Sequence, residues 1–299
     1  MTDRVLDLSE RAASLSVSNS QLSVRFGKEE PITIPLSDLA VVIVSHPQVH
    51  YTHAVLSGLA VAGAMFVTCD EKHLPVSMML PLVTHSLQTE RFAAQASLPL
   101  PVRKRLWQQI AKAKILAQAR LLEERTGEGA GLAALAVKVR SGDPSNVEAH
   151  AARFYWQRVF GDIEFRRDRE QEGLNACLNY GYSVLRALVA RAICGAGLHP
   201  SLSVHHHNRY DTFCLADDLM EPFRPVVDRV AARLHDERGA AVALDRDAKK
   251  LLLEALLARF DWKDESRTLF DWLNQTASSL AAAIDAGEAG AAKLFIPEL

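Results

Sequence analysis

A histidine triplet and a short acidic run lie close together two-thirds of the way along the sequence, in SVHHHNRYDTFCLADDLMEPFRP (residues 203–225). Imidazole and carboxylate side chains are groups that bind divalent metal ions in proteins. In an extended segment successive side chains point in opposite directions, so the triplet does not form one cluster of three ligands. Either His206 faces inward, or the flanking pair His205 and His207 does. The periodicity alone does not choose between them.

The acidic run predicts the first turn of a helix that carries carboxylates on one side. Asp217 or Asp218 is suited to cap this helix at its N-terminus. Glu221 follows Asp218 by three positions and therefore shares a face with it. The alternative is an ordinary capped helix whose acids lie near the favourable N-terminal dipole. Pro222 and Pro225 argue against this alternative, because two early prolines predict a rigid, kinked turn that fixes the direction of the chain.

A further carboxylate, Glu148, lies in DPSNVEAHAARFYWQRVFG (residues 143–161), a pattern typical of a loop followed by a helix. Ser145 and Glu148 match the capping-box spacing, in which Glu148 would bond back to a backbone N–H. That interpretation accounts for Glu148 completely. The alternative is a carboxylate on the first helical turn that binds a cation. His150 lies two positions after Glu148 and therefore on a different face, so it is a poor co-ligand.

Two carboxylates and one imidazole favour a divalent ion that prefers oxygen ligands. Carboxylates select Mg²⁺ or Mn²⁺, and a histidine shifts the preference toward Mn²⁺. Zinc sites more often contain cysteine or several histidines at fixed spacing, and the sequence has no such motif. A bound ion of this kind polarises a phosphoryl oxygen and lowers the pKa of an attacking hydroxyl. The residue types therefore point to phosphodiester chemistry.

The elements that must position these residues divide the chain into two parts. Short β-branched or alternating runs predict strands at 14–19, 21–27 and 31–35, and the continuous apolar run 39–45 predicts a strand buried on both faces. A short helix at 53–64 and a strand at 64–70 follow. After about residue 85 helical patterns dominate. We expect helices at 105–125, 175–193, 226–237, 247–260 and 267–286, with the apolar segment 175–193 central to the core.

The predicted fold class is therefore α+β, with a small N-terminal β-sandwich-like domain (residues 1–85) and a larger all-α catalytic domain (residues 86–299). The composition is that of a globular protein, with 299 residues, 48% hydrophobic content and a net charge of −2. No stretch approaches the ~20 apolar residues of a membrane span, and the start of the chain does not resemble a signal peptide. The four cysteines are scattered, which predicts reduced thiols in a cytoplasmic protein.

Basic residues cluster locally although the net charge is close to zero. The stretch 103–120 carries six basic residues and no acid, so a basic face for nucleic acid and an ordinary solvated helix face are both open. Arg224 follows Glu221 by three positions, and we expect it to pair with a site carboxylate or to touch a phosphate. Tyr180, Tyr182 and Trp156 are expected in the core rather than stacked on DNA. The candidate DNA-binding residues are Arg103, Lys104, Arg105, Lys112, Lys114, Arg166, Arg167 and Arg224.

Three segments together resemble the CRISPR-associated integrase family of spacer acquisition. They are DPSNVEAHAARFYW, the LNYGY of residues 178–182, and the H-x₁₁-D-x-x-E spacing that leads into MEPFRP. The combination resembles the type II branch of that family, and with the strands-then-helices order it covers nearly the whole chain. The resemblance implies a metal site of Glu148, His206 and Glu221, assisted by Asp218. It selects His206 from the triplet by its spacing to the acidic motif.

The resemblance implies a DNA integrase that is also an endonuclease-type enzyme. It would act as a homodimer formed through the β domains, with two dimers bridged by a small ferredoxin-like partner protein. The 3′-hydroxyl of a short duplex (the prespacer) would attack a phosphodiester of the repeat array, a transesterification that needs Mg²⁺ or Mn²⁺. Two other functions stay open: a metal-dependent nuclease of DNA repair, and a non-catalytic DNA-binding scaffold in which Glu148 only caps its helix.

Overall fold

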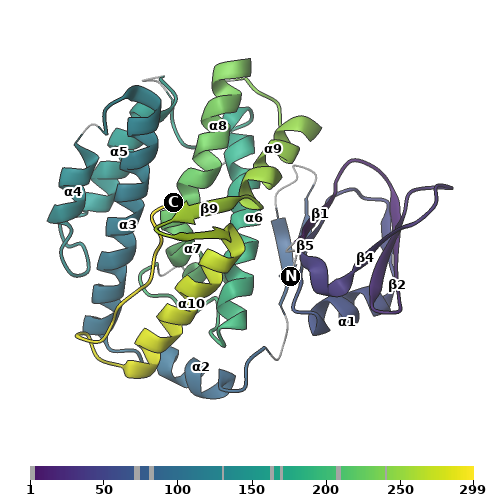
Figure 1. Cartoon of the computed structure of the whole chain (residues 1–299), viewed down its shortest axis with the longest axis horizontal. Coiled ribbons are helices and arrows are strands. Elements are labelled where there is room, and N and C mark those ends of the chain that lie inside the picture. Colours follow the sequence, from purple (N-terminus) through teal and green to yellow (C-terminus); the bar gives the residue numbers. More distant parts are fainter. Residues whose placement is uncertain are drawn as a thin grey trace.

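The computed structural model describes residues 4–70, 75–80, 84–129, 131–161, 165–168, 171–206, 210–239 and 241–299. Strands come first and helices follow, in the order that the sequence predicts (Figure 1). The N-terminal elements are β1 (Arg4–Leu8), β2 (Ala13–Ser18), β3 (Gln21–Arg25), β4 (Ile32–Pro35), the 3₁₀ helix η1 (Leu36–Asp38), β5 (Leu39–Val44), β6 (Val49–Tyr51), α1 (His53–Val61), β7 (Met65–Cys69) and β8 (Pro75–Met79).

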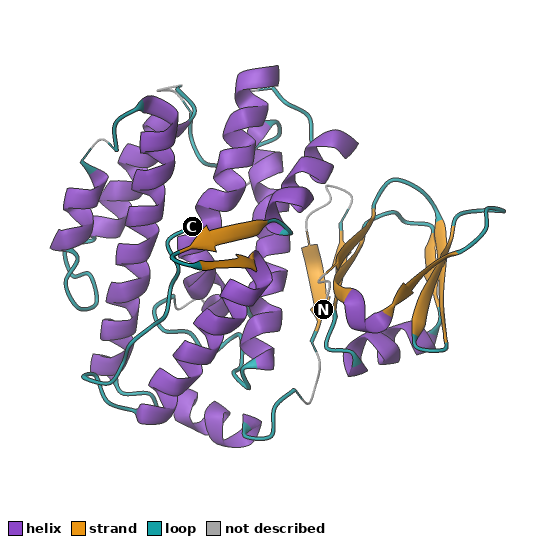
Figure 2. Cartoon of the chain, in the orientation of Figure 1, coloured by secondary structure: helices purple, strands orange, loops and turns teal. Residues whose placement is uncertain are grey.

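The helical part begins at α2 and also contains one pair of short strands (Figure 2). Its elements are α2 (Gln88–Ala96), α3 (Leu100–Thr126), α4 (Leu132–Lys138), α5 (Val147–Val159), α6 (Leu174–Gly195), α7 (Cys214–Met220), the 3₁₀ helix η2 (Glu221–Phe223), α8 (Arg224–Arg238), α9 (Arg246–Leu256), β9 (Arg259–Trp262), β10 (Glu265–Thr268) and α10 (Leu269–Ala286). The α+β class expected from the sequence is confirmed.

The N-terminal strands form two four-stranded sheets. One sheet has the order β1-β5-β7-β8, in which β1, β5 and β7 are parallel and β8 is antiparallel to β7. The other has the order β4-β3-β2-β6, in which only β2 and β6 are parallel. Leu39, Val42 and Val44 of β5 pack into the small core between the sheets. A sandwich-like N-terminal part is what the alternating strand patterns predict.

Strand β5 is buried along its whole length, as its unbroken apolar run predicts. One face of the strand belongs to the core between the two sheets. The opposite face, with Val41 and Ile43, joins the large core of the helical part. The sheet that contains β5 is therefore a shared layer, and the strand-rich and helical parts of the chain pack directly against each other.

Helix α6 is central to the helical core, in agreement with its apolar sequence. It contacts α7, α8, α9 and α10 as well as strands β5 and β7. Gly181 lies where α6 meets α8: a Cβ at this position would come within 2.4 Å of Val227 Cγ1. The glycine of the NYGY motif therefore lets the two helices approach closely.

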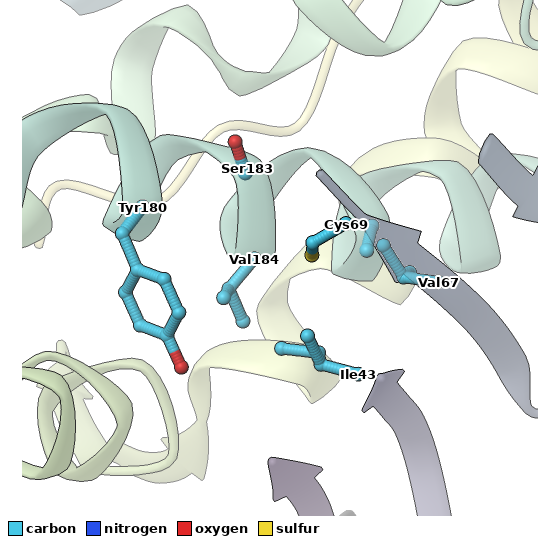
Figure 3. A pocket seen from close by; sticks show the side chains of 7 residues that line it. Ile43, Val67, Cys69, Tyr180, Ser183 and Val184 are labelled. Carbon is cyan, nitrogen blue, oxygen red and sulfur yellow. The ribbon is translucent and has the colours of Figure 1, made fainter. Parts of the chain in front are cut away.

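A small apolar pocket lies at the contact between the sheet and α6. Figure 3 shows Ile43, Val67 and Cys69 from the strands facing Tyr180 and Val184 of the helix. The cavity is about 10 Å³, which is no larger than one water requires. The hydroxyl of Tyr180 donates to the Asp7 carboxylate of β1, so one hydrogen bond fastens the strand to the helix.

The expectation of an all-α second domain is wrong in one respect. Strands β9 and β10 form an antiparallel hairpin within it, and Lys263 in the turn has a φ of 54°. The indole of Trp272 on α10 donates to the Phe260 carbonyl at 3.1 Å, which ties the hairpin to the helix. The expected helix at 247–260 accordingly ends at Leu256. The hairpin forms because tertiary packing supplies partners that four-residue strands lack on their own.

Candidate active site

Helix α3 carries a stripe of three side chains that organises the site. Arg103, Trp107 and Lys114 lie four and seven positions apart in turn and so share one face of the helix. Arg103 Nε donates to the carbonyl of Val204 at 3.2 Å. The indole of Trp107 stacks on the imidazole of His205 with ring centroids 3.9 Å apart. Lys114 reaches the acidic residues. One helix thus holds the histidine loop and the carboxylates together.

The ammonium group of Lys114 pairs with two carboxylates that are far apart in the sequence. Its Nζ contacts Glu148 Oε1, and it lies 2.6 Å from Glu221 Oε2. Burial alone would lower the pKa of Lys114, but the charges of Glu221 and Glu148 outweigh it and raise the pKa above its ordinary value. Lys114 was expected on a DNA-facing surface; its side chain is instead only 12% exposed.

Glu221 is ionised and almost fully buried. Burial alone would raise its pKa, but the positive charges of Arg224 and Lys114 overcome this effect and lower the pKa to about 2. The guanidinium of Arg224 lies 3.0 Å from Glu221 Oε1, so the two oxygens of Glu221 face two different cations. Of the two roles expected for Arg224, pairing with a site carboxylate is the one found.

The capping-box interpretation of Glu148 is wrong. Ser145 makes no capping contact at α5; instead Asp143 Oδ1 accepts from Val147 N at 3.0 Å and Oδ2 accepts from Glu148 N at 2.9 Å. A φ of 46° at Asp143 turns the loop so that this carboxylate reaches the first turn of the helix. Because Asp143 satisfies the helix terminus, the side chain of Glu148 is available to Lys114.

Asp218 positions His206. The buried carboxylate accepts from the backbone N–H groups of Val204 (2.7 Å), His205 (2.8 Å) and His206 (3.1 Å), and it lies 2.6 Å from Nδ1 of His206. These contacts use both oxygens of Asp218, which argues against the expectation that it binds an ion itself. With Nδ1 tied to Asp218, Nε2 is the nitrogen that His206 presents for other contacts. The hydrogen bond to Asp218 raises the pKa of His206.

The alternation argument for the triplet fails because the loop is not extended. The ring of His206 also lies against Trp107, edge-on at 5.4 Å, and the rings of His205 and His206 are 5.4 Å apart. His205 and His206 therefore lie on the same indole rather than on opposite sides of the chain. His207 lies outside the described residues.

The expectation that Asp217 or Asp218 caps a helix is also wrong. Helix α7 begins before both residues, with Phe213 at its N-cap. Asp217 instead pairs with Arg186 of α6, whose Nε lies 2.7 Å from Oδ1. The two prolines occupy early positions of η2 and α8, so the kinked turn that they predict is present as a 3₁₀ segment between two α-helices.

A buried hydrogen-bonded cluster supports the site from behind. The guanidinium of Arg224 lies over the ring of Tyr182, 4.6 Å from its centroid. The hydroxyls of Tyr182 and Tyr155 both donate to Asp228, the latter at 2.8 Å. Tyr155 lies seven positions after Glu148 on α5. Tyr180 and Tyr182 are buried, as expected, and Trp156 packs on Tyr155, Phe160 and Phe165.

The donor set suits Mg²⁺ or Mn²⁺, although the described residues do not form a closed ion cage. Within them, no group of three or more His, Cys, Asp or Glu side chains converges as ion ligands do. The ammonium group of Lys114 lies between Glu148 and Glu221. Glu148 and Glu221 nevertheless approach one common point, as two carboxylate ligands of a single Mg²⁺ or Mn²⁺ ion would. His206 is near enough for its charge to affect the pKa of Glu221.

The remaining basic candidates separate into two groups. Arg103 is committed to the histidine loop, and Arg167 donates to Asn175 and Asn179. Lys104, Arg105 and Arg166 are exposed, and Lys112 is partly buried. The second group is therefore the better placed for contact with a DNA backbone, although Arg105 also donates to Gln108 Oε1 at 2.7 Å.

Sequence reasoning missed Trp107 and Asp143 as site residues, and it assigned Lys114 to DNA binding rather than to the two carboxylates. A usable signal existed for Lys114, because it continues the stripe of Arg103 and Trp107 on a helix whose face is otherwise apolar. Nothing in the sequence alone indicates its partners, which lie 34 and 107 positions away.

The comparisons with known proteins agree with the fold and the motifs. The family model for "CRISPR associated protein Cas1" matches residues 6–256. The chain belongs to the Cas1 family. The family resemblance read from the sequence motifs is therefore confirmed.

Cas1 relatives cover most or all of the chain. A CRISPR-associated endonuclease Cas1 from Neisseria meningitidis serogroup C (strain 8013) is 35% identical over 301 residues, which covers 100% of this chain and 97% of the relative. A second, from Pyrobaculum aerophilum, is 28% identical over 272 residues, covering 86% of this chain and 92% of the relative. The motifs of the site therefore lie in a chain whose curated relatives are named as endonucleases.

Solved structures with the Cas1 fold superpose over most of the chain. A casposase bound to integration product has a TM-score of 0.79 and 20% identity, covering 95% of this chain and 91% of that chain. A Cas1 protein from Thermotoga maritima has a TM-score of 0.76 and 16% identity, covering 94% and 97%. Among the described helices, none is long and apolar enough to cross a bilayer.

Proposed function

We propose that this Cas1 protein is a divalent-metal-dependent DNA integrase that inserts short duplexes into a CRISPR repeat array. The observation that carries the proposal is the convergence of Glu148 and Glu221 on one cationic nitrogen, beside a histidine held by Asp218. Such a pair of carboxylates, one buried and one partly buried, and an oriented imidazole is a donor set for Mg²⁺ or Mn²⁺. The casposase neighbour, whose structure is titled as bound to integration product, supports integration as the reaction class.

Glu148, Glu221 and His206 Nε2 would hold the ion. When bound, an ion there polarises the phosphoryl oxygen and lowers the pKa of the attacking 3′-hydroxyl. Arg224 keeps Glu221 ionised and in place. Asp218 fixes the direction of His206, and Trp107 supports its ring. The protein supplies geometry and charge, because the nucleophile belongs to the DNA.

The partners follow from the same proposal. Double-stranded DNA would bind as prespacer and as repeat array, with Lys104, Arg105, Lys112 and Arg166 near its phosphates. The protein assembles as a homodimer, and a small ferredoxin-like partner protein bridges two of these homodimers. A structural neighbour titled as a Cas6-RT-Cas1–Cas2 complex has a TM-score of 0.79 and 19% identity, covering 98% of this chain and 36% of that chain, and supports a multi-protein assembly. The Neisseria relative is compatible with the type II branch.

A joining assay tests the proposal. The protein, its partner protein, a labelled short duplex and a supercoiled plasmid with a repeat array are incubated with Mn²⁺. Label that becomes covalently attached to the plasmid supports integration. Cleavage of either DNA without joining would instead support the repair nuclease. Salt-sensitive DNA binding with neither reaction would support the non-catalytic scaffold.

A further inference from the structure

Lys114 occupies the position that a bound ion would need. Its Nζ contacts the same oxygen atoms, Glu148 Oε1 and Glu221 Oε2, that face each other across the site. The three side chains are 12%, 18% and 7% exposed, so little water screens their charges. An ion bound to both oxygens would lie within contact distance of the ammonium group, and two positive charges at that distance repel strongly.

The charges around Lys114 already balance. Glu148 and Glu221 contribute two negative charges, and Lys114 and Arg224 contribute two positive charges. A dication added to a balanced cluster gains little attraction. If the ammonium group moves away, the remaining three groups carry a net charge of −1, which attracts the ion. The lysine stem has four rotatable carbons, so its ammonium group can leave without any movement of α3.

We propose that Lys114 is a resident counter-cation that a divalent ion must displace. It holds the two carboxylates together before the ion binds, and it sets a low affinity for the ion. The displaced ammonium group is then available to a phosphodiester oxygen of bound DNA, which couples ion binding to DNA binding. The inference deepens the proposed function and rests on it, since it assumes that Glu148 and Glu221 bind the ion.

Mn²⁺ binding measured by calorimetry on the full-length protein, without DNA, tests the inference. Lys114→Met should bind Mn²⁺ at least about tenfold more tightly than the wild type, because a competing unit charge at contact distance is gone. Lys114→Arg keeps the cation and should bind no more tightly than the wild type. Lys250→Met is the matched control: Lys250 pairs with Glu254 on the exposed surface of α9, so its removal should leave Mn²⁺ affinity within about twofold.

Lys114→Met leaves two buried carboxylates with one cation fewer, so it should melt at a lower temperature without ion. Mn²⁺ should then raise its melting temperature by more than it raises that of the wild type. A second measurement needs no destabilised variant. In wild-type protein with ¹³C-labelled lysine, the Cε–Hε signal of Lys114 is identified as the one that is missing from the spectrum of Lys114→Arg. Diamagnetic Mg²⁺ should shift this signal, while the Lys250 signal stays unchanged.

The outcomes separate the inference from the proposed function. If Mn²⁺ binds the wild type and Lys114→Met with equal affinity, or if Mg²⁺ binds without shifting the Lys114 signal, Lys114 is a static ion pair and the inference is wrong while the metal site stands. If neither ion binds wild type or variant, with or without duplex DNA, the metal-dependent function fails as well.

Discussion

The carboxylate of Asp218 holds His206 by both its backbone and its ring, accepting from the amide N–H at 3.1 Å and lying 2.6 Å from Nδ1. The same carboxylate also accepts from the amides of Val204 and His205. One buried side chain therefore fixes the conformation of the loop and the direction of the imidazole. Asp218 thereby fixes the orientation of the His206 ring although His206 lies in a loop.

Replacement of Asp218 should weaken ion binding although Asp218 is not placed as a ligand. We expect Asp218→Asn to bind Mn²⁺ about 10–100-fold more weakly by calorimetry, the usual effect of losing an orienting partner of a metal ligand. The amides of residues 204–206 should also exchange faster with deuterium. Asp217→Asn is the control, since Asp217 pairs with Arg186 instead. If Asp218→Asn leaves both the Mn²⁺ affinity and the amide exchange rates unchanged, the conformation of the loop does not depend on Asp218.

The two candidate caps of α5 give a direct stability test. Asp143→Ala should lower the free energy of unfolding by about 1–2 kcal/mol in urea denaturation, because two N–H groups of the first turn lose their acceptor. Ser145→Ala should change it by less than about 0.5 kcal/mol, since Ser145 is exposed and makes no capping contact. Equal decreases in the free energy of unfolding in the two variants would instead support the capping-box interpretation.

Asp228 predicts a pH dependence of stability. Burial, opposed by the hydrogen bonds from Tyr182 and Tyr155, raises the pKa of Asp228 to about 6. A raised carboxyl pKa contributes stability that is present below the unfolded-state pKa of about 3.9 and is lost as the pH rises through about 6. Between pH 4 and 6.5 the free energy of unfolding of the wild type should fall by on the order of 2–3 kcal/mol relative to that of Asp228→Asn. Urea denaturation across this range measures the difference; a difference independent of pH would contradict the prediction.

DNA binding should depend on the exposed basic residues rather than on the partly buried Arg103 and Arg167. Lys104→Ala with Arg105→Ala should reduce the slope of log affinity against log salt by about 0.9 for each phosphate that the variant no longer neutralises. Fluorescence anisotropy with a labelled duplex at several salt concentrations gives the slope. Lys250→Met removes one exposed charge far along the sequence and serves as the control. A slope that does not change would place the DNA on another surface.

The parts of the fold that depend on local pattern could be predicted. The apolar run of β5 indicated burial on both faces, and the apolar sequence of α6 indicated its central place. The hairpin at β9 and β10 could not, because its short polar strands are stabilised by α10. The same limit explains Asp143, whose capping contact depends on a φ of 46° that no spacing rule includes.

The candidate site was predictable only as a set of residue types. The family spacing selects Glu148, His206 and Glu221, and the structure brings Glu148 and Glu221 to one nitrogen atom. The alternation rule failed at His205 and His206 because the loop bends around the carboxylate of Asp218. Lys114 could not be paired with its acids, because contacts between distant helices depend on packing and not on sequence separation.

The joining of labelled duplex to a repeat-array plasmid by Glu221→Gln tests the central claim most directly. The substitution removes the charge of Glu221, which faces Lys114 and Arg224, but nearly keeps the shape of the side chain. The wild type should join label to plasmid in Mn²⁺, and the variant should lose joining by at least about 100-fold while it binds duplex DNA with nearly unchanged affinity. Joining at the wild-type rate, or an equal loss of DNA binding, would contradict a catalytic role for the two converging carboxylates.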